Sequence, residues 1–117
     1  MRAMAEIALV EATDKLTHVA LRGRIESTGA EKLEDELTRQ TVARRKPAIV
    51  DITGVEALPS IGIGMLIKTA RSMHSYGLIF GVVATGNCKT ILERLNVHTI
   101  FPVVATYDEA LRACMLD

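Results

Sequence analysis

Residues 48–66 read AIVDITGVEALPSIGIGML, and this stretch decides the fold class. It opens with a short, almost entirely apolar run, which is typical of a strand buried on both faces of a parallel sheet. A connecting loop follows, and Ser60 then predicts the start of a helix, because serine is a good N-cap residue. A buried strand, a loop and a helix in this order indicate an α/β domain.

The helix that begins at Ser60 is predicted to extend to about Tyr76, and Gly77 is placed to end it. Apolar residues recur along it at the spacing of a core-facing stripe, namely Ile63, Leu66, Ile67, Ala70 and Met73. At about 100° per residue, the opposite side carries Ile61, Met65, Lys68 and Ser72. We therefore expect Ile61 and Met65 to be exposed and to form an apolar docking patch.

Upstream of this unit, the pattern predicts an antiparallel hairpin followed by a helix. Strands are expected at 6–12 and 16–22, on either side of a short polar turn. Thr28 and Glu31 fit a capping box, which predicts that the helix begins there with Thr28 as its N-cap. This helix should end before Pro47, since proline cannot continue it.

Downstream, two more strands are predicted at 78–84 and 100–104, and each is followed by a helix. The first of these helices should bury Ile91, Leu92 and Leu95, and Pro102 places the last strand at a sheet edge. Strands that alternate with helices pair in parallel through crossovers. The expected fold is α/β: one domain, residues 1–117, with a mixed, mostly parallel sheet of about five strands, an N-terminal hairpin and about four helices.

The bulk composition limits the classes of function. Lys+Arg 14 balances Asp+Glu 14, so nothing predicts nucleic-acid binding through bulk charge. Cys88 and Cys114 form no CxxC or paired-histidine pattern, so neither a zinc site nor a disulfide is expected. No apolar stretch reaches membrane-spanning length, and no signal region follows the first residues. We expect a cytoplasmic protein that does not insert into membranes and carries no metal or cofactor.

The catalytic motifs searched for are missing, which favours a protein without enzymatic activity. None of the three histidines stands in a motif relation to Ser60, and glycine is absent from the position before Pro59 that a G-x-S-x-G elbow requires. Cys88 falls at a predicted helix start, where the dipole can activate a thiol, but a small semi-buried residue is the preferred interpretation. A nucleotide-binding role for the G-I-G at 62–64 stays an alternative, although Ile67 replaces the third glycine of the dinucleotide fingerprint.

The chain resembles the STAS domain of bacterial anti-sigma factor antagonists at several segments. Residues 49–55, IVDITGV, match a buried strand that ends D-hydrophobic-S/T-G-V, and residues 58–66, LPSIGIGML, are similar to the D-S-S-G-hydrophobic-G segment. An early L-x-G-x-hydrophobic-D segment is also similar at 21–26, a late segment at 91–97 with 100–103, and the last helix at 108–111. The similarity covers nearly the whole chain.

The resemblance implies a STAS fold and a regulatory interaction. Antagonists of this family bind a kinase-type anti-sigma factor, which releases the sigma factor, and the kinase then phosphorylates the first serine of D-S-S-G. By position, that serine is Ser60. A phosphate there would lie at a helix N-terminus, which is a favourable anion site. The predicted partner-binding residues are Pro59, Ser60, Ile61, Met65 and Lys68.

The chain departs from the family pattern at three positions. Pro59 stands where the family has aspartate, Ile61 where it has the second serine, and Asn96 where it usually has glycine. Pro59 and Ile61 favour an alternative function, in which the chain is a non-phosphorylated STAS scaffold subunit of a signalling or lipid-transport complex. A weak homodimer is a further alternative.

Overall fold

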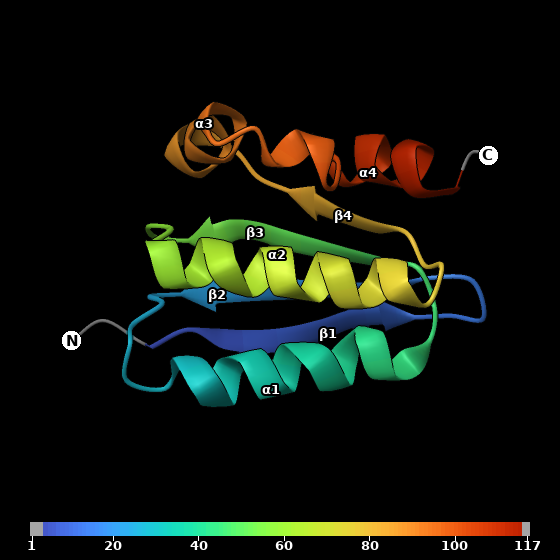
Figure 1. Cartoon of the computed structure of the whole chain (residues 1–117), viewed down its shortest axis with the longest axis horizontal. Helices are drawn as coiled ribbons and strands as arrows, with labels where there is room; N and C mark the ends of the chain where they lie inside the picture. Colours follow the sequence, from blue (N-terminus) through green and yellow to red (C-terminus); the bar gives the residue numbers. More distant parts are fainter. Residues whose placement is uncertain (1–3, 116–117) are drawn as a thin grey trace.

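The computed structural model describes residues 4–115, and its sheet has the strand order β1-β2-β3-β4-β5. The strands are β1 (Glu6–Ala12), β2 (Thr17–Gly23), β3 (Ala48–Val55), β4 (Phe80–Val83) and β5 (Val103–Val104). β1 and β2 pair antiparallel as a hairpin, and β2, β3 and β4 run parallel to one another (Figure 1). β5 pairs parallel with β4. The predicted mixed, mostly parallel sheet is confirmed, and β5 lies at its edge.

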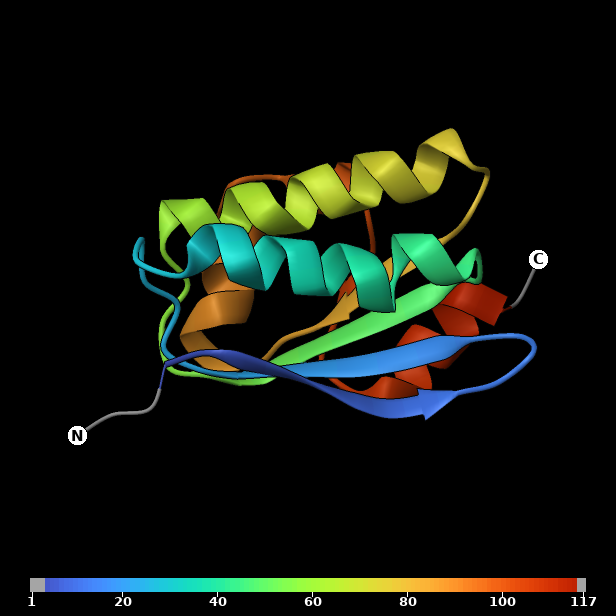
Figure 2. The same cartoon turned by 90° about the horizontal axis from the view of Figure 1, so that it is seen from below.

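The sheet is covered by helices on both faces. The helices are α1 (Ala30–Gln40), α2 (Ser60–Ser75), α3 (Gly86–Arg94) and α4 (Tyr107–Met115), with short 3₁₀ helices η1 (Val42–Arg44) and η2 (Val97–Thr99). Figure 2 shows α1 and α2 side by side over one face of the sheet, with α4 against the other. The four predicted helices are therefore present, arranged in three layers.

Two apolar clusters form on the two sides of the sheet. The larger one lies under α1 and α2 and includes Leu37, Leu66 and the aromatic pair Phe80 and Phe101, which meet edge to face at 5.4 Å. The smaller one lies under α4 and comprises Leu16, Ile49, Val83, Ala110 and Cys114. Because α4 packs on its own cluster, both faces of the central strands are buried, as their continuous apolar sequence predicts.

The predicted capping box at Thr28 is wrong, whereas Thr106 caps the start of α4 with its side chain. The N-cap of α1 is Gly29, which has φ 93° and is followed by a helix with no side-chain cap. Glycine adopts this left-handed conformation without steric cost, so the chain enters α1 after Gly29 rather than after Thr28. At α4, the backbone N–H of Glu109 donates to Thr106 Oγ1 at 3.2 Å.

The segment after α3 also differs from the prediction. Leu95 was expected in the core but is 54% exposed, because α3 ends at Arg94 and Asn96 turns the chain with φ 58°. Asparagine tolerates this left-handed conformation, which explains why it can stand at a position where glycine is usual in the family. Val97 of η2 is buried instead, and η2 shortens the last strand to Val103–Val104.

The contact between Gly81 and Cys114 gives a testable packing prediction. A Cβ at Gly81 would lie 2.9 Å from Cys114 Sγ, and Cys114 is buried on the side of α4 that faces the sheet. We expect Gly81→Ala to lower the free energy of unfolding by about 1–3 kcal/mol, as is usual for overpacking. Urea denaturation measures this change. Cys114→Ala removes the clashing sulfur, so Gly81→Ala should lower the free energy of unfolding much less in the Cys114→Ala background. An equal loss of unfolding free energy in both backgrounds would contradict the contact.

Candidate functional site

The start of α2 is pressed against the core, and this contact positions Ser60. Leu58, in the loop before α2, is only 5% exposed. A Cβ at Gly62 would lie 3.1 Å from the Cδ1 atoms of both Ile25 and Leu58. The glycine thus allows the first turn of α2 to approach these two side chains closely. Ser60, two residues earlier, remains exposed at the surface.

Ser60 is the first residue of α2 and not its N-cap, which corrects the prediction. The N-cap is Pro59, with φ −76° and ψ 168°, and no side chain caps the helix. The Pro59 carbonyl accepts hydrogen bonds from the N–H groups of Gly62 and Ile63 at 2.9 and 3.1 Å. Extended backbone at Pro59 suits a proline, whose ring holds φ near this value. The Ser60 hydroxyl is therefore not used as a cap by the helix it starts.

The prediction that Met65 is exposed is wrong, because α1 packs against this side of α2. Met65 is 2% exposed, whereas Ile61 remains 43% exposed. The buried residues of α2 are Gly62, Met65, Leu66, Thr69, Ala70 and Met73. Ile63 and Ile67 of the expected core stripe are only partly buried. The buried face of α2 is thus rotated toward α1 relative to the predicted stripe.

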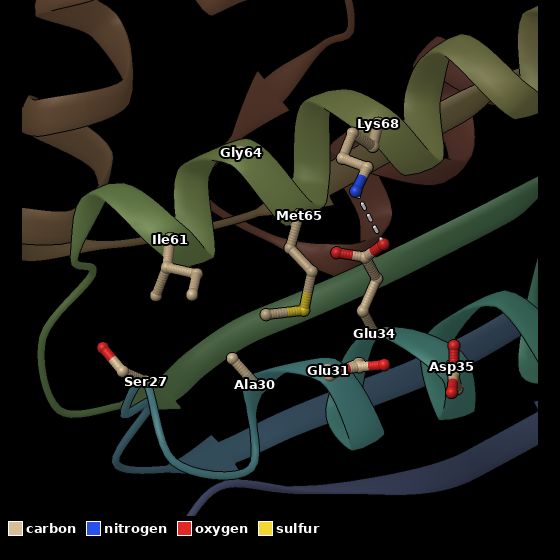
Figure 3. A pocket seen from close by; sticks show the side chains of 9 residues that line it. All are labelled: Ser27, Ala30, Glu31, Glu34, Asp35, Ile61, Gly64, Met65 and Lys68. Carbon is tan, nitrogen blue, oxygen red and sulfur yellow. Dashed lines mark ion pairs between the residues drawn. The ribbon is translucent and has the colours of Figure 1, made fainter.

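A groove of about 660 Å³ lies between α1 and α2 (Figure 3). Its lining residues are Ser27, Ala30, Glu31, Glu34, Asp35, Ile61, Gly64, Met65 and Lys68. Lys68 Nζ lies 2.9 Å from Glu34 Oε2 and forms an ion pair across the groove. Three predicted contact residues, Ile61, Met65 and Lys68, thus lie together along one side. Pro59 and Ser60 lie at the helix start, outside the lining.

The sequence interpretation missed the wall that α1 supplies. From the sequence, the acidic residues Glu31, Glu34 and Asp35 indicate only a helix start, where the dipole favours anions. Their spacing of i, i+3 and i+4 places them on one face of a helix, and this pattern is visible in the sequence. Only the packing of α1 beside α2 shows that this acidic face borders the groove.

The other candidate side chains lie elsewhere. His18 lies on β2 and stacks on Tyr107 of α4, with ring centroids 4.2 Å apart, so it is on the sheet face opposite α2. Cys88 is buried, and burial raises the pKa of its thiol, which contradicts the alternative of an activated cysteine. Within residues 4–115, no group of three or more His, Cys, Asp or Glu side chains is placed to hold a metal ion.

Among the described residues, no helix is both long enough and apolar enough to cross a bilayer.

Comparisons with known proteins relate the whole domain to one family. The STAS domain model matches residues 8–110. A crystal structure of an anti-sigma factor antagonist from Mycobacterium paratuberculosis is 29% identical, with a TM-score of 0.80 over 93% of this chain and 94% of that one. No curated protein is similar enough to count as a match.

Two more distant structures share the fold. A STAS domain protein from Planctomyces limnophilus is 19% identical, with a TM-score of 0.73 over 96% of this chain and 98% of that one. The anti-sigma factor antagonist SpoIIAA in its unphosphorylated form is 13% identical, with a TM-score of 0.72 over 92% of this chain and 94% of that one. The same architecture therefore persists at low sequence identity.

His18 gives a prediction on pH dependence. Burial lowers its pKa, although Asp51 and Glu11 partly oppose this, and its Nε2 atom is buried with no hydrogen-bond partner among the described residues. The unfolded chain then binds a proton more readily, so the free energy of unfolding should fall as pH drops below about 6.5. Urea denaturation between about pH 7.5 and 5.5 measures this fall, which His18→Gln should reduce. His74→Gln, at an exposed position, is the control, and equal pH slopes for His18→Gln and wild type would refute the prediction.

Proposed function

The chain belongs to the STAS domain family, and on that premise we propose that it is an anti-sigma factor antagonist. Its partner is a kinase-type anti-sigma factor, which docks on the N-terminal end of α2. In this proposal the chain acts by protein interaction and not by catalysis. Binding of the antagonist occupies the anti-sigma factor, and the sigma factor is released.

One observation carries the proposal: Ser60 and Ile61 stand together, both exposed, on the first turn of α2. Ile61 is a large apolar side chain that is 43% exposed, and the packing of Leu58 and Ile25 against Gly62 holds it in place. An exposed apolar residue beside a hydroxyl offers a partner both a contact and a position that a kinase can modify. The resemblance of residues 58–66 to the D-S-S-G-hydrophobic-G segment supports the proposal, because it matches Ser60 to the serine that is phosphorylated in this family.

Phosphorylation of Ser60 would act as a switch for simple electrostatic reasons. The N–H groups of Gly62 and Ile63 already donate to the Pro59 carbonyl. Those of Ser60 and Ile61 have no acceptor within their own helix, and α2 has no side-chain cap. A phosphate there would be stabilised by these groups and would add about −1.5 to −2 charges at pH 7. The same charge would stand next to Ile61, where an apolar contact with the partner has to form. Phosphorylation would therefore stabilise α2 locally and release the partner.

Substitution of Ser60 tests the switch. Ser60→Asp places a negative charge beside Ile61 and should weaken binding to the kinase-type anti-sigma factors of the same genome by at least about tenfold. Ser60→Ala should retain binding, and isothermal titration calorimetry measures both affinities. Incubation of wild-type chain with such a factor and ATP should add the mass of one phosphate, and Ser60→Ala should add none. Tight binding without any mass gain would refute the phosphorylation switch, but it would still support binding to the anti-sigma factor.

The alternative is a constitutive scaffold that is never phosphorylated, and the start of α2 provides a specific argument for it. Pro59 occupies the N-cap, so no carboxylate stands beside the Ser60 hydroxyl at that position. Ile61 adds apolar area where the family has a second serine. Under this alternative the same surface of α2 binds a permanent partner subunit, and the mass measurement distinguishes the two functions.

Both functions require Ile61 at the interface. Ile61→Glu should weaken binding by at least about tenfold, because a charge would be desolvated in an apolar contact, and should leave the urea midpoint nearly unchanged. Leu9→Glu is the matched control, since Leu9 on β1 is also 43% exposed. Equal affinity of wild type and Ile61→Glu would exclude this face. Met65→Glu is unsuitable, because it would bury a charge in the core.

A further inference from the structure

Gly64 has no evident role in the packing of the chain itself. It lies inside α2, where glycine destabilises a helix relative to alanine, and its φ is not in the left-handed region that favours glycine. A Cβ at Gly64 would meet no atom within 4 Å. Gly62 differs, because Ile25 and Leu58 crowd it at 3.1 Å. The fold therefore explains Gly62 and leaves Gly64 unexplained.

Gly64 lines the groove between α1 and α2, so its missing side chain leaves α2 backbone accessible there (Figure 3). Ile61 and Met65 lie on either side of it along α2, and Ala30 of α1 faces them across the groove. Small residues between larger apolar ones allow another chain to approach a helix closely. A close neighbour from outside the chain is a physical reason for glycine at this position.

The opposite wall of the groove carries an excess of negative charge. It presents three carboxylates, Glu31, Glu34 and Asp35, and Lys68 pairs with Glu34 at 2.9 Å. No ion pair joins Glu31 or Asp35 to a described residue, and the two stand four residues apart on α1, where like charges repel. A cationic group between them would relieve this repulsion. The groove therefore favours a basic occupant over an acidic one.

The groove is also suited to a helix rather than to an extended peptide. An extended peptide gains affinity by adding to a strand edge, but both walls here are helices, whose backbone groups are bonded internally. Recognition must then use side chains, as when an amphipathic helix lies in an apolar groove. We propose that this groove binds a basic amphipathic helix of the protein partner. Its small or apolar face packs on Ile61 and Gly64, and its Lys or Arg side chains face Glu31 and Asp35.

This inference rests on the proposed function, because the helix is assigned to the same anti-sigma factor that docks at Ser60. It adds a second contact to that interaction. The first contact is at the exposed start of α2 and is sensitive to phosphorylation. The groove lies further along α2 and its lining does not include Ser60.

Gly64→Ala separates a binding role from a structural one. The substitution should raise the melting temperature of the free chain by about 2–5 °C, since alanine is the better helix former and no neighbour opposes its Cβ. It should also weaken binding to the kinase-type anti-sigma factor by at least about tenfold in calorimetry. Ser72→Ala, at an exposed position of α2 outside the groove, is the control and should leave affinity unchanged.

The charge argument is tested with a double variant. Glu31→Gln with Asp35→Asn should weaken binding by at least about fivefold at low salt and should reduce the dependence of affinity on salt concentration. Asp14→Asn with Asp108→Asn makes the same change in net charge at exposed positions outside the groove and should have little effect. Equal effects of the two double variants would overturn the proposed basic helix.

The remaining outcomes are also decisive. A lower melting temperature for Gly64→Ala would mean that the glycine serves the fold, and unchanged affinity would mean that nothing packs on it; either result overturns the proposal. In another outcome, wild type binds the anti-sigma factor and Ile61→Glu weakens binding, while Gly64→Ala and the double variant of Glu31 and Asp35 leave affinity unchanged. That result would support the proposed function and overturn the proposal that a helix binds in the groove. If no kinase-type anti-sigma factor binds wild type, both fail together.

Discussion

Burial of β3 on both faces is the constraint on which the other elements depend. Val50 and Ile52 point into the cluster under α1 and α2, and Ile49 points into the cluster under α4, each at 0% exposure. A strand buried on both faces requires a helical layer on each side of the sheet. The chain supplies these layers before and after β3, and the parallel pairing of β3 with β2 and β4 places it at the centre.

The position of the proposed interaction surface follows from the end of this strand. β3 runs to Val55, and a short loop then brings Leu58 back into the core before α2 begins. Because Leu58 and Gly62 are fixed by packing, the two residues between Pro59 and Gly62 stay at the surface in a defined orientation. Core packing on one side of the loop thus determines what a partner meets on the other side.

The acidic groove and the start of α2 combine into one extended face, since Ile61 belongs to both. An apolar contact supplies affinity, while carboxylates at its border select partners by charge and speed their association. A phosphate on Ser60 would add negative charge at one end of a face whose α1 wall is already acidic. In the proposed interaction, charge on this face would therefore select a basic partner and also oppose an extra negative group at its edge.

The amino-acid sequence alone predicts the element order, the mixed sheet with its N-terminal hairpin, the buried β3 and the exposed Ile61 on the first turn of α2. These features depend on local spacing, apolar periodicity and turn residues, which are all read along one segment. The capping of α1 was not determined in this way, because Thr28 and Gly29 are both acceptable caps and the backbone at Gly29 decides between them. The burial of Met65 and the acidic wall opposite it were decided only by the tertiary structure. Periodicity shows which residues share a face of a helix, but the neighbour of that face depends on where α1 packs.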